Sequence, residues 1–217
     1  MDIRSIAPEE LADRTSERRT VASETVYEGH IWDVRRDEFE LAEGTGALSR
    51  DYITHPGAVS VLVLDDEDRV LLINQYRRPV GMTMWEIPAG LLDVAGEDPA
   101  AAARRELAEE ADLRAERWAV LVDFHNSPGS SSEANRIFLA RGIGEVPEDR
   151  LHERDGEEAE IHGAWVPLDD AVRAVLEGRL NSPAAVIGLL AAHAARADGY
   201  RSLRPADTPW PGHPAHR

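Results

Sequence analysis

The sequence predicts an α/β protein in which helices flank a mixed sheet. Its strongest β signals are two nearly continuous apolar runs, residues 58–64 and 69–76, separated by an acidic turn. Such runs are typical of buried strands, and we expect these two to form a central hairpin. The other elements are helix patterns at 99–111, 168–177 and 183–196 and strand patterns at 118–124, 136–140 and 161–166. Strands interspersed with helices favour helical layers on a sheet.

The two ends of the chain differ in composition from this central region. Residues 1–20 are polar and charged, and we expect a flexible arm with one helical turn. Residues 20–28 and 30–41 alternate nearly regularly and predict a hairpin at Glu28-Gly29, and residues 50–54 predict another short strand. We therefore treat 21–56 as an N-terminal region of short strands. The main domain then covers 57–197. The Pro-rich tail, 198–217, is expected along the surface or disordered.

Composition excludes several classes of function. The 41 acidic and 24 basic residues give a net charge of -17, which disfavours a nucleic-acid polymer as partner. All basic residues are Arg, so Schiff-base lysines and a P-loop lysine are excluded, and phosphate contacts must come from Arg, backbone amides or metal. The absence of Cys excludes thiol nucleophiles, thiolate zinc sites and disulfides. Since no signal-peptide core or membrane-length apolar run is present, we expect a soluble, cytoplasmic protein without membrane contact.

Residues 86–113 carry the chemistry, because a Gly-containing loop precedes a helix crowded with carboxylates. Asp98 is a good N-cap, and Pro99 suits the first helical position. Glu106, Glu109 and Glu110 project from overlapping parts of one helix face and repel one another, so a positive group should compensate. Hard oxygen ligands suit Mg²⁺, with Mn²⁺ possible. The alternative is a solvated helix face with Arg105–Glu109 and Arg104–Glu110 pairs.

The upstream context favours the metal interpretation. Glu97, seven further residues and then Arg105-Glu106-Leu107-Ala108-Glu109-Glu110-Ala111-Asp112-Leu113 resemble the box of the Nudix family. Two positions depart from the pattern. Six residues separate Gly90 from Glu97 where the family has five, and Asp112 replaces a Gly at the helix exit, where Asp adopts the left-handed conformation less readily. Neither departure removes a carboxylate.

The resemblance implies a Nudix α/β/α sandwich around a mixed sheet, with 57–197 as the catalytic domain and a small N-terminal β subdomain. It also implies that Glu106, Glu110 and the Ala89 carbonyl bind a divalent metal, that Glu109 belongs to the same catalytic cluster, and that Arg105 and Glu97 orient it. The alternative for Glu97 is a structural role, in which the helix dipole stabilises an acid at the N-terminus of the helix.

Features outside the box resemble the ADP-ribose pyrophosphatase branch of that family. They are Pro128 downstream of the box, the segments 75–79 and 85–90, and the N-terminal extension, which in that branch is exchanged across a homodimer. The candidate substrate-binding residues are Arg77, Arg78, Glu86, Trp32, Arg35, Pro128 and Glu133. The alternatives are a plain turn at Pro128, surface arginines at 77 and 78, and core packing for Trp32.

The proton acceptor is expected on the acidic loop at 152–160. By its Asp-Gly-Glu step, Glu157 resembles the branch's catalytic glutamate, with Glu160 next, although the loop could simply be solvated. The expected reaction is Mg²⁺-dependent hydrolysis of the pyrophosphate of ADP-ribose, or a similar nucleotide sugar, to AMP and ribose 5-phosphate. The alternatives are hydrolysis of other nucleoside diphosphate sugars or dinucleoside polyphosphates, and a non-catalytic nucleotide-sugar sensor.

Overall fold

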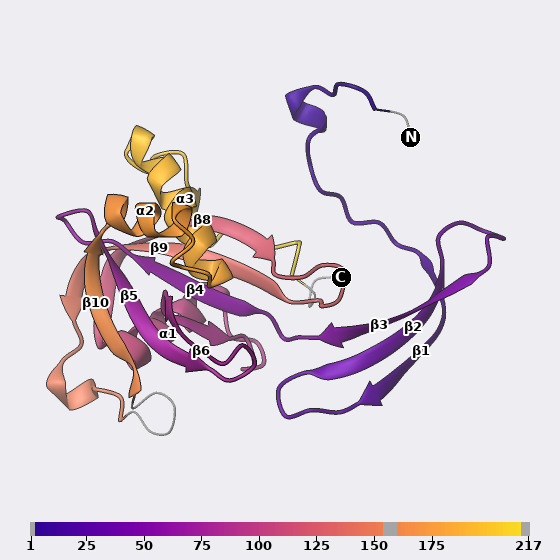
Figure 1. Cartoon of the computed structure of the whole chain (residues 1–217), viewed down its shortest axis with the longest axis horizontal. Coiled ribbons are helices and arrows are strands. Elements are labelled where there is room, and N and C mark those ends of the chain that lie inside the picture. Colours follow the sequence, from indigo (N-terminus) through magenta and orange to yellow (C-terminus); the bar gives the residue numbers. More distant parts are fainter. Residues whose placement is uncertain (1–2, 154–159, 214–217) are drawn as a thin grey trace. The chain divides into compact units, whose positions relative to one another are not determined.

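The computed structural model describes residues 3–153 and 160–213, and the chain divides into two compact units, Met1–Ile53 and Thr54–Arg217. The first unit begins with one 3-10 turn, η1 (Pro8–Glu10). A three-stranded sheet of order β1-β2-β3 follows, formed by β1 (Arg19–Tyr27), β2 (Asp33–Glu40) and β3 (Ala47–Thr54) (Figure 1). Antiparallel pairing of β1 with β2 confirms the predicted hairpin at Glu28-Gly29.

The second unit contains a mixed five-stranded sheet and a smaller three-stranded one. The larger has the order β11-β8-β9-β4-β7 and consists of β4 (Ala58–Val63), β7 (Ala89–Leu91), β8 (Leu113–His125), β9 (Ala134–Glu145) and β11 (Arg204–Pro205). Strand β4 runs parallel to β9, and the other pairs are antiparallel. The smaller sheet, β10-β5-β6, consists of β5 (Arg69–Arg77), β6 (Met82–Glu86) and β10 (His162–Pro167).

The expected central hairpin of residues 58–64 and 69–76 is wrong. Both segments are strands, but β4 and β5 lie in different sheets and share a single bridge, between Leu64 and Val70. The backbone of β4 is already paired on both edges, with β9 on one side and β7 on the other. Its side chains are buried along its whole length, as in an interior strand covered on both faces.

Helices cover both faces of the larger sheet and confirm the expected α/β/α sandwich. Helices α2 (Leu168–Leu176) and α3 (Pro183–Ala195) pack on one face through a cluster that includes Leu62, Ile137 and Leu189 (Figure 1). Helix α1 (Pro99–Ala111) packs on the other face through Val61, Leu107 and Phe138. Two more 3-10 turns are η2 (Glu148–Arg150) and η4 (Arg196–Asp198). In the described part of the chain, no helix is long and apolar enough to cross a membrane.

The C-terminal segment is more firmly placed than its Pro-rich composition indicates. Strand β11 extends the larger sheet by pairing Arg204 and Pro205 with β8. Further along, the Trp210 side chain is only 6% exposed. We refer to residues 204–213 as the C-terminal strap.

Candidate active site

Helix α1 begins and ends where the sequence predicts. The Asp98 carboxylate accepts hydrogen bonds from the backbone N–H groups of Ala100 (3.0 Å) and Ala101 (3.1 Å), while Pro99 opens the helix. At the exit Asp112 adopts the left-handed conformation, with φ 56°, and its N–H donates to the Ala108 carbonyl at 3.1 Å. The left-handed exit therefore forms even though Asp replaces the usual Gly.

Arg105 supplies the positive group that the carboxylates of α1 require. Its guanidinium donates twice to Glu97, at 3.1 and 3.0 Å, and also reaches Glu106 at 2.6 Å and Glu109 at 3.0 Å. The hydrogen bond from Arg105 lowers the pKa of Glu97 below its usual range, against a smaller opposing effect of burial. These acids raise the already high pKa of Arg105, so the group stays charged. The Arg105–Glu109 pair is thus part of a four-residue network.

Arg104, by contrast, packs against the sheet. It donates to the Ala100 carbonyl at 3.0 Å, and its guanidinium lies 5.1 Å from the centre of the Trp118 ring. The two adjacent arginines therefore differ in role, because only Arg105 joins the acidic cluster among the contacts described.

Strand β7 lies directly against the carboxylates of α1. The Ala89 N–H donates to Glu110 Oε2 at 2.9 Å. At Gly90, a β-carbon would collide with the carboxyl group of Glu106, so a side chain there would displace that carboxylate. Pairing of β7 with β4, including Ser60 with Ala89, holds this backbone in place. These contacts place Glu106 and Glu110 beside one short stretch of backbone.

The donor set fits a divalent ion of the magnesium type. Across residues 3–153 and 160–213, no three acidic or histidine side chains converge into a ready metal cage. Mg²⁺ does not require one, since it keeps several waters and is held by one or two carboxylates together with substrate phosphates. Glu106 and Glu110 are such donors, and both are partly buried.

Two predicted substrate-binding residues are paired with each other. Arg77 at the end of β5 donates to both carboxylate oxygens of Glu86, at 2.9 and 2.7 Å. The Glu86 side chain is 10% exposed and that of Arg77 is 40% exposed, so the arginine can still reach solvent. Arg78 is exposed in the turn that follows.

Other predicted residues lie in loops or in the N-terminal unit. Pro128 lies in an exposed turn, and Glu133 accepts a hydrogen bond from Asn126 at 2.6 Å. In the N-terminal unit, Trp32 is 42% exposed, which does not fit the core-packing alternative, and Arg35 donates to Ser23 at 2.6 Å.

The predicted proton acceptor stays a prediction. Glu157 lies among residues 154–159, outside the described residues. Glu160, the next candidate, is exposed two residues before β10.

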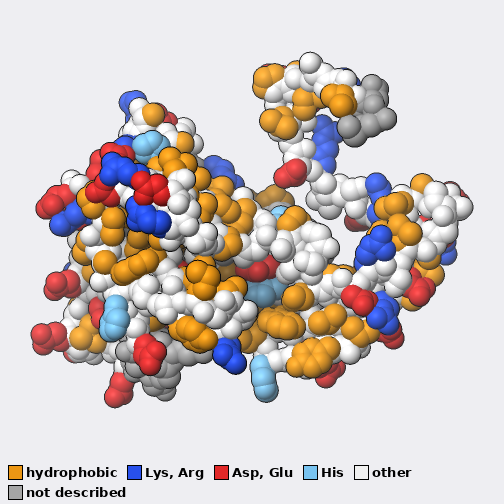
Figure 2. Space-filling model, in the orientation of Figure 1, with side chains coloured by type: hydrophobic (Ala, Val, Ile, Leu, Met, Phe, Trp, Pro, Cys, Tyr) orange, Lys and Arg blue, Asp and Glu red, His pale blue; other side chains and the backbone are white. Residues whose placement is uncertain are grey.

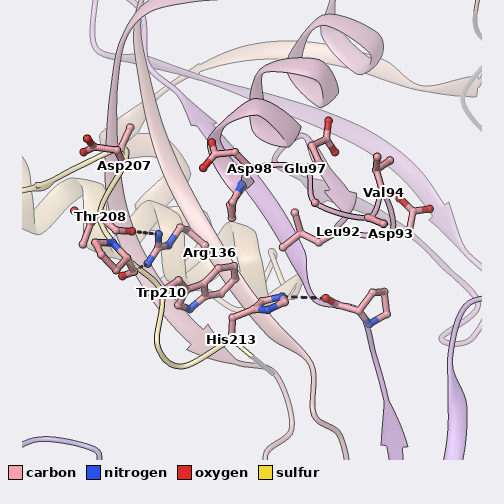
Figure 3. Close-up of a pocket in the computed structure, with 16 residues that line it drawn as sticks. Leu92, Asp93, Val94, Glu97, Asp98, Arg136, Asp207, Thr208, Trp210 and His213 are labelled. Carbon is pink, nitrogen blue, oxygen red and sulfur yellow. Dashed lines mark hydrogen bonds between the residues drawn. The ribbon is translucent and has the colours of Figure 1, made fainter. Parts of the chain in front are cut away.

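Sequence reasoning missed a cavity of about 670 Å³ beside the box. One wall is residues 92–99, and the other is the strap, from Ala206 to His213 (Figure 3). The floor includes Arg136, which is 1% exposed and forms a two-point ion pair with Asp123, at 2.7 and 3.0 Å. No local pattern indicates this arrangement, because an arginine in a strand usually faces solvent.

A mixed sheet between helical layers, in which strand β7 and a glutamate-bearing helix meet at one acidic cluster, makes this an α/β protein with a carboxylate site suited to a divalent ion. The chain belongs to the Nudix family: the NUDIX domain model matches residues 54–186. This confirms the family expected from the box. Enzymes of this family generally use divalent metal ions.

Similar proteins agree with this membership. The chain is 42% identical over 191 residues to an ADP-ribose pyrophosphatase of Mycobacterium tuberculosis, covering 88% of this chain and 90% of that protein. It is 36% identical over 162 residues to an ADP-ribose pyrophosphatase of Bacillus subtilis, covering 75% and 85%. A solved ADP compounds hydrolase superposes with a TM-score of 0.68, covering 87% of this chain and 99% of that chain at 21% identity, and this likeness supports the fold.

Proposed function

We propose that the protein hydrolyses the pyrophosphate of ADP-ribose, releasing AMP and ribose 5-phosphate. The observation that carries the proposal is the network in which Arg105 holds Glu97, Glu106 and Glu109 beside the loop of Gly90. This network belongs to a hydrolase of the Nudix family. The ADP-ribose specificity rests on the relatives that carry that name.

Glu106, Glu110 and the Ala89 carbonyl are the proposed ligands of Mg²⁺, with Mn²⁺ as a substitute. A divalent ion supplies charge neutralisation on the phosphates and a more acidic bound water. Arg105 orients the Glu106 carboxylate from one side at 2.6 Å, while the Ala89 N–H orients Glu110 from the other at 2.9 Å. Removing a group that orients a metal ligand in this way commonly lowers metal affinity or activity by roughly 10- to 100-fold.

The remaining roles follow the sequence expectations. Arg77, held by Glu86, is the proposed diphosphate contact together with Arg78, because a planar guanidinium can donate two parallel hydrogen bonds to phosphate oxygens. Trp32 and Arg35 are proposed as adenine contacts, and Pro128 and Glu133 as further substrate-binding residues. Glu157 is the proposed proton acceptor, with Glu160 and Glu109 as the next choices.

A homodimer is proposed from the N-terminal unit. This unit exposes large apolar side chains, namely Val21, Val26, Tyr27, Ile31, Trp32 and Leu41. Figure 2 shows hydrophobic side chains over the unit. A small sheet that exposes apolar side chains gains stability by covering them. A solution mass near 23.9 kDa would contradict the dimer. We also propose a cytoplasmic location, with which a chain lacking Cys is compatible.

The test is AMP release from a panel of ADP-ribose, other nucleotide sugars and diadenosine polyphosphates, with Mg²⁺ or with EDTA. We expect the highest kcat/KM on ADP-ribose and loss of turnover in EDTA. Glu106→Gln should lower kcat/KM by at least about 10²-fold, since metal charge stabilisation amounts to several kcal/mol and each 1.4 kcal/mol is tenfold. A higher kcat/KM on another substrate class would reject ADP-ribose, and full activity in EDTA would reject the metal.

A further inference from the structure

The C-terminal strap is fixed to the sheet by Arg136. This buried guanidinium donates to the Thr208 carbonyl at 2.6 Å and to the Pro209 carbonyl at 3.3 Å (Figure 3). These bonds add to its ion pair with Asp123. The same guanidinium lies 4.7 Å from the centre of the Trp210 ring. Because a buried cation is costly unless it is fully paired, these contacts define one position for the strap.

The end of the strap contacts the backbone just before β4. Trp210 and His213 are 6% and 8% exposed, and their ring centres lie 4.8 Å apart. His213 Nε2 lies 3.0 Å from the Pro56 carbonyl oxygen, and since a carbonyl can only accept, this nitrogen carries the hydrogen (Figure 3). Gly57 has φ 95°, and a β-carbon there would collide with the His213 ring. The imidazole thus occupies the space a side chain at 57 would need.

From Gly57 the contacts continue to the carboxylates of α1. The Gly57 carbonyl accepts a hydrogen bond from the Leu92 N–H at 3.1 Å, which extends the β4–β7 ladder by one step. Within that ladder, Ala89 donates to Glu110 and Gly90 lies against Glu106. His213 is therefore linked to both carboxylates through a short stretch of paired backbone.

The loop between β7 and α1 is held at its two ends, by the hydrogen bond from Leu92 to Gly57 at its start and by the Glu97–Arg105 ion pair at its end. Residues 93–96 are all exposed, and the cavity of about 670 Å³ separates this loop from the strap. It is also the loop that is one residue longer than the family pattern. The start of this loop therefore depends on the backbone pairing that the strap holds at Pro56 and Gly57.

We propose that His213 and Trp210 are positioning residues for the metal-binding carboxylates Glu106 and Glu110. The strap fixes the backbone at 56–57, this backbone pairs with β7, and β7 holds the two carboxylates of α1 in place, with the Ala89 N–H on Glu110 and Gly90 against Glu106. The inference rests on the proposed metal site, so its test measures metal binding separately from hydrolysis.

The experiment measures Mn²⁺ affinity by electron paramagnetic resonance on the full chain without nucleotide, alongside kcat/KM for ADP-ribose. We expect His213→Ala to weaken Mn²⁺ binding by roughly 10- to 100-fold, the usual effect of removing a group that orients a ligand. His213→Gln, which keeps an N–H donor, should restore most of the affinity. His193→Ala is the matched control, because His193 is exposed on α3, on the opposite face of the sheet.

Two further variants separate positioning from general loss of stability. Leu180→Ala removes a buried side chain from the cluster on the α2 and α3 face and should destabilise the fold without weakening Mn²⁺ binding. If it weakens binding as much as His213→Ala, the positioning role is rejected. Wild-type Mn²⁺ affinity in His213→Ala also rejects it. If His213→Ala does not fold, Trp210→Phe takes its place. Weaker Mn²⁺ binding in Trp210→Phe supports the positioning role, and wild-type affinity rejects it.

A different result would reject the metal site itself. Glu106→Gln should abolish Mn²⁺ binding. If this variant binds Mn²⁺ as the wild type does, the proposed ligands are wrong, whatever His213→Ala does.

Discussion

Glu97 and Arg105 form a two-point ion pair, with Arg105 Nε 3.1 Å from Glu97 Oε1 and Nη2 3.0 Å from Oε2. The remaining terminal nitrogen, Nη1, contacts both Glu106 and Glu109. Glu97 precedes the helix and Arg105 lies in its second turn, so the pair joins the loop to α1. Both side chains are partly buried, with 17% and 33% exposure, so water screens the pair less than a surface salt bridge.

Arg105→Lys should keep the fold but impair the site. A lysine ammonium cannot donate two parallel hydrogen bonds to Glu97 while also contacting Glu106. We expect kcat/KM to fall by roughly 10- to 100-fold, with a similar loss in Mn²⁺ affinity. Arg104→Lys is the control, since Arg104 contacts Trp118 and the Ala100 carbonyl. Equal losses in the two variants would show that the effect comes from the helix and not from the acidic cluster.

Gly90→Ala should displace the Glu106 carboxylate, because the added methyl group would occupy its place. We expect loss of measurable Mn²⁺ binding and a fall in unfolding free energy, read from urea denaturation. The matched control is Gly144→Ala, where the new carbon meets Arg114 at an ordinary contact distance of 3.4 Å. In a Glu106→Ala background, Gly90→Ala should cost little stability. A full cost in that background would mean that the methyl group collides with something other than Glu106.

Asp123→Asn should destabilise the protein, because it leaves the buried Arg136 without its charge partner. Removing one member of a buried ion pair costs about 3–5 kcal/mol. The control is Asp170→Asn, since Asp170 forms an exposed pair with Arg173 and its loss should have little effect. Urea denaturation at neutral pH measures both.

The stability difference between wild type and Asp123→Asn should also depend on pH. Burial raises the pKa of Asp123, but hydrogen bonds from Arg136 and Arg204 outweigh it and hold the pKa below its usual 3.8. A carboxyl group with a lowered folded pKa contributes fully above the unfolded value and loses its contribution as pH falls through the folded value. The stability difference between wild type and Asp123→Asn should therefore be constant above about pH 5 and shrink below about pH 4. A difference independent of pH would show that the charge of Asp123 is not its source.

Local signals were enough to predict the elements that carry the site. Helix α1 has the predicted bounds because its start depends on Asp98 and Pro99, and the carboxylate spacing is a property of the helix itself. The need for a positive partner followed from charge repulsion alone, and Arg105 supplies it.

Pairings between distant segments could not be predicted in the same way. The apolar patterns of β4 and β5 predict strands but not which sheet each one joins. Arg136 is buried because Asp123, Thr208 and Pro209 come to it from positions 13, 72 and 73 residues away. Trp210 and His213 lie in a Pro-rich segment whose composition resembles a disordered tail, and only their contacts with Arg136 and Pro56 give them a fixed place.

Glu157→Gln should separate the proton acceptor from the metal ligands. Loss of a general base lowers turnover by roughly 10²- to 10⁴-fold, whereas Mn²⁺ affinity should stay within about twofold of wild type because Glu157 is not a proposed ligand. Glu148→Gln, an exposed acid in η2, is the control. Near-normal turnover in Glu157→Gln at saturating Mg²⁺ would move the role to Glu160 or Glu109. Glu160→Gln then distinguishes these two: a loss of turnover assigns the role to Glu160, and normal turnover assigns it to Glu109.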